Sequence, residues 1–276
     1  MGNKLGIFRR RWCLGIIALS ILLLGLIYVS GYVCDFVNHH ILCANNQGVI
    51  TNEANVTNIE KISYVKEGVE ASYPRIISGG SPASLEKWNE IIKRDFDKIL
   101  QIYSFQPFPE SIPNPTGVVP IFLKITYEVK ANTDSRLSLF YRADYNSIYS
   151  AHPSNLIYTT NIDKKRDKRL SLRDVVQLNE AFVKDFRNWS IKAGEEDSPE
   201  IQEAIHEYIK NITDEELLTG FRAADRIGSN NPWGIYSYQT QDNLGISIEV
   251  PHYAGDHAEF EQSLGELEKK GMLKKE

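Results

Sequence analysis

The strongest pattern of apolar positions in this chain lies near its start. Residues 12–33 form a run of 22 residues without a charged side chain, and Arg9, Arg10 and Arg11 stand directly before it. As a helix this run is roughly 33 Å long, enough to cross the hydrocarbon core of a bilayer. The basic cluster predicts a cytoplasmic stub at 1–11, a transmembrane signal-anchor at 12–33 and an extracytoplasmic C-terminal part. The alternative is a signal peptide that is cleaved, which would release a secreted protein.

Farther along, apolar residues recur first at helical and then at strand spacing. From Leu85 to Tyr103 they follow one another at steps of three and four, which predicts a long helix with one apolar face. From Val119 the period becomes two, in "VPIFLKITYEVK", "RLSLFYRADYNSIY" and "LIYTTNI". Strands joined by short turns are typical of an antiparallel meander that is half-buried on a helix.

The second half of the chain mixes helical and strand patterns. Three helices are expected at about 179–192, 198–211 and 213–223, and Thr213 with Glu216 has the spacing of a capping box. A last hairpin is expected in "PWGIYSYQTQDNLGISIEV", with its turn at "TQDN". The predicted fold class is therefore α+β, with a meander sheet packed against a long helix and a second portion made of helices and a hairpin.

These patterns divide the chain into segments. The Asn-rich stretch at 34–60 lacks an apolar period and is expected to be a polar stalk. Residues 61–267 are expected to form the extracytoplasmic domain, in two sub-parts at about 61–165 and 166–267. The charged residues 268–276 are expected to be a frayed tail.

Composition and charge narrow the class of protein. The chain has 276 residues, of which 42% are hydrophobic and 24% charged, as in an ordinary globular protein. Residues 1–34 carry four basic and no acidic side chains, so the remainder holds 27 basic and 36 acidic ones, a formal charge of −9. An acidic body argues against a nucleic-acid partner and is compatible with a cationic one.

The three cysteines have different expected roles. Cys13 lies inside the apolar run, whereas Cys34 and Cys43 fall after it, on the side predicted to be extracytoplasmic. Cys34 and Cys43 are expected either to close a small disulfide loop or to remain two free thiols. The cysteine spacings match no zinc motif, and we expect neither a metal nor another cofactor.

The segment "VPHYAGDHAEF" holds two histidines, two acids and a tyrosine in eleven residues. A metal site would need His252 and His257 to converge with Asp256 or Glu259, and their spacing is not that of a helical zinc pair. A bend is the preferred interpretation. Pro251 cannot donate a sheet hydrogen bond and suits a strand end, and Gly255 can adopt a positive φ.

A third histidine, His152, lies near a serine and a tyrosine, in "YSAHP". A nucleophile there would need Ser150, His152 and an orienting acid in contact, which the sequence does not establish, and the chain has no Gly-x-Ser-x-Gly elbow. His152 is more simply a residue at the junction of a strand and a loop. We take His152, Tyr149, Tyr253 and His252 as candidate binding residues and expect no catalytic residue.

Several phrases, in order, resemble a known family. They are "YPRIISGG", "ITYEVKANTDSRLSLFYRADY", "SAHPSNLIYTTNIDKKRDKRLSLRDVV" and "GISIEVPHYAGDHAEFEQSLGEL", which together span about Tyr73 to Leu267. They are similar to the extracytoplasmic domain shared by PdaC-type peptidoglycan deacetylases, in their N-terminal part, and RsiV-type anti-sigma factors. In that family the last strand leaves through a Pro-x-Tyr-Ala-x-Gly bend, which Pro251, Tyr253, Ala254 and Gly255 match.

The resemblance implies a domain of the cell surface. RsiV-type domains bind lysozyme, but about 11 residues before the apolar run are too few to hold a sigma factor. The catalytic part of the PdaC-type enzymes has no counterpart in this sequence. The expected function is therefore a membrane-anchored binding or sensing domain for peptidoglycan or for a wall-directed cationic protein such as lysozyme. The alternatives are a wall-glycan hydrolase or deacetylase with an unrecognised site, and a non-catalytic adaptor for another membrane protein.

Overall fold

The computed structural model describes residues 57–66, 68–104, 122–146, 152–192, 198–228 and 230–275. All of them belong to one compact unit, Gln47–Glu276. The predicted signal-anchor, Cys34, Cys43 and Tyr149 lie outside the described residues. No helix in the described part of the chain is long and apolar enough to cross a membrane.

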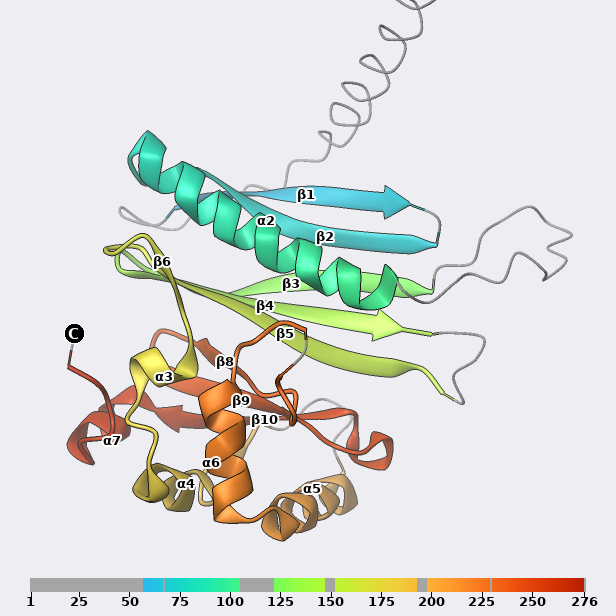
Figure 1. Cartoon of the computed structure of the whole chain (residues 1–276), viewed down its shortest axis with the longest axis vertical. Coiled ribbons are helices and arrows are strands. Elements are labelled where there is room, and N and C mark those ends of the chain that lie inside the picture. The colour runs from blue at the N-terminus through green and yellow to red at the C-terminus, as the bar shows by residue number, and fades with distance from the viewer. Residues whose placement is uncertain are drawn as a thin grey trace, which may run out of the picture. The chain divides into compact units, whose positions relative to one another are not determined.

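A six-stranded sheet with the order β1-β2-β3-β4-β5-β6 forms the first layer (Figure 1). Its strands are β1 (Asn58–Lys66), β2 (Val69–Ser78), β3 (Leu123–Asn132), β4 (Arg136–Tyr145), β5 (Ser154–Asp163) and β6 (Lys168–Leu170). The predicted meander is confirmed for β3 to β5, which pair antiparallel, and β6, which was not predicted, pairs antiparallel with β5. The pairing of β1 with β2 was not predicted, and β1 begins inside the stretch expected to be stalk.

One pair of strands departs from the predicted antiparallel meander. β2 and β3 pair in parallel, with Val69 opposite Leu123, and the long helix α2 (Pro82–Ser104) lies between them in the chain. Parallel neighbours require such a crossover connection. The predicted apolar face of α2 is confirmed, because Trp88, Ile92 and Phe96 are buried in the core beneath it.

A second sheet has the order β7-β10-β9-β8. Its strands are β7 (Ser190–Ile191), β10 (His257–Ser263), β9 (Asn243–Glu249) and β8 (Tyr236–Gln239). The predicted hairpin is β8 and β9, and β10 and β7 extend it. The helix expected at 179–192 is shorter, because α4 (Glu180–Phe186) ends in a turn and the chain then pairs with β10.

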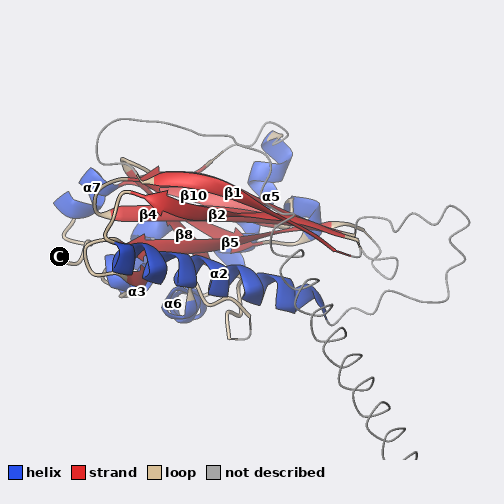
Figure 2. Ribbon diagram, turned by 90° about the horizontal axis from the view of Figure 1, so that it is seen from above, coloured by secondary structure: helices blue, strands red, loops and turns tan. Residues whose placement is uncertain are grey.

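Helices cover one face of the second sheet (Figures 1 and 2). They include α3 (Leu172–Val175), α5 (Pro199–Asn211), α6 (Asp214–Ala223) and α7 (Leu264–Lys269), and a 3-10 turn η1 (His252–Ala254) follows β9. The predicted capping box is confirmed, since Thr213 Oγ1 accepts from the Glu216 amide and the Glu216 carboxylate accepts from the Thr213 amide. This side holds its own apolar core, which includes Phe182, Phe221 and Phe260.

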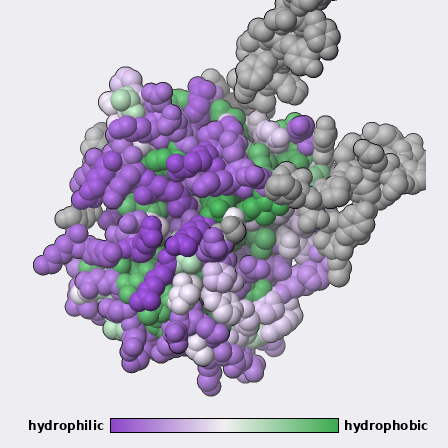
Figure 3. All heavy atoms as spheres, viewed as in Figure 1, coloured by the Kyte–Doolittle hydropathy of each residue, from purple (hydrophilic) through white to green (hydrophobic). Residues whose placement is uncertain are grey.

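The other face of the second sheet packs against the first sheet. The rings of Phe140 in β4 and Tyr238 in β8 meet edge to face at 5.3 Å, and Tyr158 in β5 meets Tyr236 at 5.2 Å. The order of layers is therefore α2, first sheet, second sheet and helices. The face seen in Figure 3 is mostly hydrophilic, with apolar side chains showing between polar ones.

The C-terminal tail is fastened to the fold, so the expectation of a frayed end is wrong for residues 268–275. The Lys274 amide donates to Val175 O at 2.8 Å, and the Gln177 amide donates to Met272 O at 2.8 Å. Val176 and Leu273 form an antiparallel bridge. These backbone bonds hold the last residues beside α3.

Candidate functional site

Two of the predicted binding residues meet in space. His152, just before β5, and His252, at the start of η1, stack their rings at 3.5 Å with an angle of 8° between the planes. The two histidines are 100 positions apart in the chain. We call them the histidine pair. Tyr253 beside them is 70% exposed.

The bend that follows β9 positions His252. Gly255 has a φ of 99° and Asp256 a φ of 68°, and Gly255 is the type of residue that tolerates this geometry. Asp256 fastens the bend, because its Oδ1 lies 2.9 Å from His252 Nδ1 and its Oδ2 accepts from the Asn155 amide at 2.9 Å. Pro251 lies directly before η1. The bend thus joins the second sheet to β5 of the first.

His257 follows the same bend but faces inward. Its Nε2 lies 3.3 Å from Arg142 NH1. Burial and then the Arg142 charge lower the pKa of His257, and they outweigh the opposing influence of Glu259, the Asn155 backbone and Asp256. Because an arginine can only donate, Nε2 accepts and the proton sits on Nδ1. Nδ1 is buried and has no hydrogen-bond partner among the described residues.

The two histidines of the bend therefore do not converge on one point. His252 is half exposed and paired with Asp256, whereas the His257 side chain is 12% exposed and faces Arg142. Within the described ranges, no group of three or more His, Cys, Asp or Glu side chains is placed to hold a metal ion.

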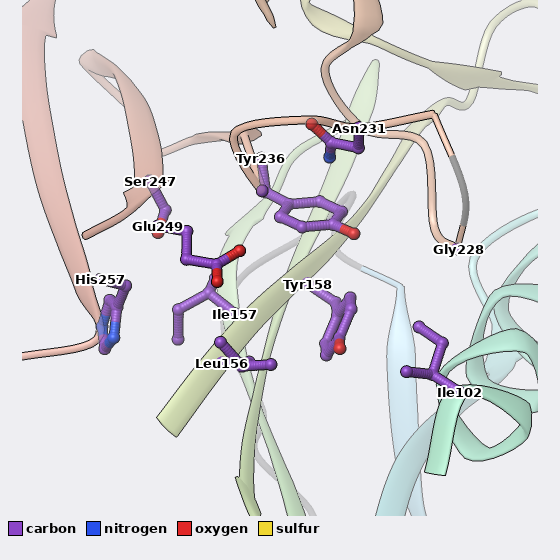
Figure 4. Close-up of a pocket in the computed structure, with 11 residues that line it drawn as sticks. Ile102, Leu156, Ile157, Tyr158, Gly228, Asn231, Tyr236, Ser247, Glu249 and His257 are labelled. Carbon is purple, nitrogen blue, oxygen red and sulfur yellow. The ribbon is translucent and has the colours of Figure 1, made fainter. Parts of the chain in front are cut away.

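A cavity of about 290 Å³ opens at the edge of β5, where α2, Gly228, residues 231–234 and the second sheet meet (Figure 4). We call it the inter-sheet cavity. Its lining combines apolar, aromatic and polar side chains and two glycines. The lining residues are Ile102, Leu156, Ile157, Tyr158, Gly228, Asn231, Gly234, Tyr236, Ser247, Glu249 and His257.

The second sheet contributes the polar wall of this cavity. Ser247 is fully buried and its Oγ has no hydrogen-bond partner in the described structure, as is true of His257 Nδ1. Burial and the charge of Asp256 raise the pKa of Glu249. The Glu249 carboxylate lies against Gly234, where a Cβ would come within 2.7 Å of Oε2. A side chain at position 234 would displace Glu249.

Two tyrosines form another part of the lining, Tyr158 of β5 and Tyr236 of β8, which pairs with Ser247 of β9. Tyr158 and Tyr236 meet at 5.2 Å in a T-shaped arrangement, and the hydroxyls of Tyr158 and Tyr103 lie 3.1 Å apart. Burial is the main cause that raises the pKa of Tyr158, to about 12, and it also raises those of Tyr103 and Tyr236. These phenols stay protonated at neutral pH and present neutral hydroxyls and ring faces.

An ionic cluster lies farther along the same face of the second sheet. The Tyr238 hydroxyl lies 2.8 Å from both Glu259 Oε2 and Glu261 Oε1, and Lys192 Nζ lies 3.1 Å from Glu261. These hydrogen bonds and the Lys192 charge lower the pKa of Glu261 even though burial raises it. Glu259 and Glu261 therefore link β8 and β10 to Lys192, which follows β7, within the second sheet.

His152 and His252 are candidates predicted from the sequence, whereas the cavity residues Ser247 and Glu249 were not predicted. A signal for them exists in "GISIEV", where Ile246 and Ile248 alternate with Ser247 and Glu249. Successive side chains of a strand point to opposite faces, so Ser247 and Glu249 lie on the face that is turned away from the main apolar core. Tyr236, at the start of β8, is 4% exposed.

Comparisons with known proteins add similarities of structure. No family model matches the sequence, and no curated protein matches it. A DUF3298 family protein of Pseudomonas aeruginosa is similar, with 14% identity, a TM-score of 0.45, and coverage of 79% of this chain and 94% of that one. A DUF3298 family member of Bacteroides fragilis has 15% identity, a TM-score of 0.43, and coverage of 80% and 96%.

Proposed function

We propose that this protein is a membrane-anchored extracytoplasmic binding domain that recognises a sugar component of the cell wall in the inter-sheet cavity. The apolar run at 12–33 with Arg9–Arg11 before it supports the anchor and its orientation. The resemblance to the PdaC and RsiV extracytoplasmic domain supports a place at the cell surface. His252 and Tyr253 lie on the bend that leads to His257 in the cavity wall, and His152 stacks on His252 from the start of β5.

The observation that carries this proposal is the lining of the cavity. A sugar presents hydroxyls that donate and accept, together with an apolar ring face. The cavity offers aromatic rings from Tyr158 and Tyr236 and a carboxylate from Glu249, which has no hydrogen-bond or ion-pair partner among the described side chains. Its volume of about 290 Å³ suits a small ligand. Buried polar atoms without partners, as at Ser247, are unusual in folded proteins and point to a missing partner.

Binding without turnover fits the contacts of these groups better than catalysis. A serine nucleophile needs a base in hydrogen-bonding contact, and Ser247 Oγ has none in the described residues. His257 Nε2 faces Arg142, and a lowered pKa keeps the ring neutral. The enzymatic alternative, a wall-glycan hydrolase or deacetylase, would release reducing sugar or acetate.

A second candidate partner is a cationic wall-directed protein such as lysozyme. It is favoured by the formal charge of −9 on residues 35–276. Such a partner would bind over a wide surface and would be sensitive to salt. An adaptor for another membrane protein would bind neither ligand.

The proposal is tested with the full chain in detergent micelles, titrated with soluble peptidoglycan fragments and, separately, with lysozyme. Ile102 lines the cavity and is 36% exposed, so Ile102→Trp fills the opening with little disturbance of the core. The matched control is Ile77→Trp, on β2, at a residue 48% exposed and outside the cavity lining. Ile102→Trp should weaken binding of the fragments by tenfold or more, about 1.4 kcal/mol, and the control should not.

Equal affinities for wild type and Ile102→Trp would remove the cavity from the proposal. Tight binding to lysozyme alone would favour the second candidate, and release of acetate or reducing sugar would favour an enzyme. The mass of the mature protein would show whether the anchor is retained and whether Cys34 and Cys43 are joined.

A further inference from the structure

A second cavity, of about 490 Å³, lies at the other end of the first sheet and shares no residue with the inter-sheet cavity. Segments distant in the sequence meet there: the start of β4, the β5–β6 turn, β6, α3 and the C-terminal tail. Six of its lining side chains are cationic. These are Arg136, Lys165, Arg166, Lys168, Lys274 and Lys275, and we call the site the basic pocket.

The two carboxylates in this lining are already engaged by neighbouring groups. Asp163 accepts from the amides of Lys165 and Arg166, both at 3.0 Å, and from Arg166 NH1 at 2.8 Å. Asp174 Oδ2 accepts from the Ser171 amide at 2.9 Å and from its hydroxyl at 2.8 Å. With six cations and two anions the lining has a net formal charge of +4.

Most of this positive charge is not balanced inside the protein. Lys165, Lys168, Lys274 and Lys275 are exposed, and in the described residues none of them has a carboxylate within 4 Å. The rest of residues 35–276 is strongly acidic, so the cations are gathered against the overall charge of the body. Like charges brought together in this way repel, and an anion that binds all of them relieves the repulsion.

The pocket is also held in place before any ligand arrives. The tail that carries Lys274 is fixed by its bond to Val175 O at 2.8 Å. The turn that carries Lys165 is fixed at both sides, by Asp163 and by Lys164, whose Nζ donates to Asn132 Oδ1 at 2.8 Å and to Thr133 O at 2.6 Å. A preorganised site binds more tightly because less ordering is needed on binding.

We propose that the basic pocket binds an anion that carries several phosphate groups. A single phosphate would neutralise only part of a +4 lining spread over 490 Å³. Lysine ammonium groups and an arginine guanidinium are the side chains that bind phosphate oxygens through charge-assisted hydrogen bonds. This site is separate from the proposed sugar-binding cavity, so either proposal can fail without the other.

The probe for this proposal is inorganic tripolyphosphate, titrated calorimetrically into the full chain in uncharged detergent micelles at about 50 mM salt, where charge interactions are weakly screened. The variant Lys165→Ala/Lys168→Ala removes two exposed cations whose side chains make no hydrogen bond in the described residues. The control Lys61→Ala/Lys66→Ala removes the same charge from exposed positions on β1, away from the pocket. We expect 1:1 binding, a loss of tenfold or more in the pocket variant, and a change of less than twofold in the control.

Three results would overturn the proposal. The first is an absence of binding to the wild type at low salt. The second is an equal loss in both variants, which would mean that the anion senses only the general charge of the protein. The third is equally tight binding of citrate, because a tricarboxylate would then satisfy the pocket as well as phosphate does.

Discussion

At the scale of single residues, the two histidines of the bend have different surroundings although they are close in the sequence. His252 and His257 are five positions apart, yet the first is half exposed beside Asp256 and the second is 12% exposed beside Arg142. Burial and then the Arg142 charge lower the pKa of His257. The His257 ring therefore binds a proton less tightly in the folded protein than in the unfolded chain.

This difference predicts a pH dependence of stability. The contribution of His257 is fully present above its ordinary pKa of about 6.5, and it is lost as the pH falls from there toward the lowered pKa of the folded state. The loss is at most about 1.4 kcal/mol per pH unit for one proton. Urea unfolding between pH 7.5 and pH 5, values chosen to bracket about 6.5, should show a smaller decline for His257→Gln than for wild type.

The control for this measurement is His206→Gln, which changes an exposed histidine of α5. It should keep the decline of the wild type. A decline of the same size in His257→Gln would mean that other groups cause it.

At the scale of elements, the two faces of strand β9 pack against different neighbours, the helices on one face and Tyr238 on the other. Ile246 and Ile248 face the helices and belong to their core, whereas Gly245 lies beneath the ring of Tyr238. A methyl group at position 245 would overlap that ring. Because the Tyr238 hydroxyl contacts Glu259 and Glu261, the glycine allows the aromatic and ionic contacts of β8 and β10 to form together.

Gly245→Ala is therefore expected to destabilise the fold. Displacement of Tyr238 should lower the free energy of unfolding by about 1–3 kcal/mol, as overpacking in a core does. Gly265→Ala is the matched control, because Gly265 lies in α7 with a negative φ and its nearest neighbour, Ser263 Oγ, would be 3.6 Å from the added Cβ. The control should be neutral or slightly stabilising, by up to about 1 kcal/mol. Denaturant titrations that rank the two variants in the opposite order would contradict this account of β9.

At the scale of the whole molecule, one buried carboxylate ties the two sheets together. Asp225 is 2% exposed and accepts from the Thr159 hydroxyl of β5 at 3.1 Å, the Ser237 amide of β8 at 2.6 Å and the Leu172 amide of α3 at 2.6 Å. The Asn161 side chain adds a bond from β5 to Ser237 O at 2.8 Å. The two apolar cores are thus joined by buried polar contacts that are costly to break.

We expect the two cores to unfold as one. Pulsed hydrogen exchange along a urea titration should show α2 and β4 losing protection at the same midpoint as α4 and β9. Asp225→Ala leaves several buried donors unsatisfied and should lower the free energy of unfolding by about 2–5 kcal/mol. Both midpoints should therefore move to lower urea concentration together. Asp242→Ala, at an exposed acid in the β8–β9 turn, should change it by less than about 0.5 kcal/mol. Separate midpoints in the wild type would mean two independent domains.

The sequence by itself determined the elements whose pattern is local. The apolar face of α2, the strands β3 to β5, the β8–β9 hairpin and the Thr213–Glu216 cap are confirmed, because each is written in the spacing of neighbouring residues. The membrane anchor, the disulfide and the ligand stay predictions.

Tertiary structure alone decided which distant segments meet. It paired β2 with β3 in parallel, ended α4 early so that β7 could join β10, stacked His152 on His252 and fastened the tail beside α3. It also placed Ser247 and Glu249 in the lining of the inter-sheet cavity and brought the six cations of the basic pocket together. The physical reason is that periodicity reports which side of an element is apolar, whereas the partner that covers that side is chosen by packing over the whole chain.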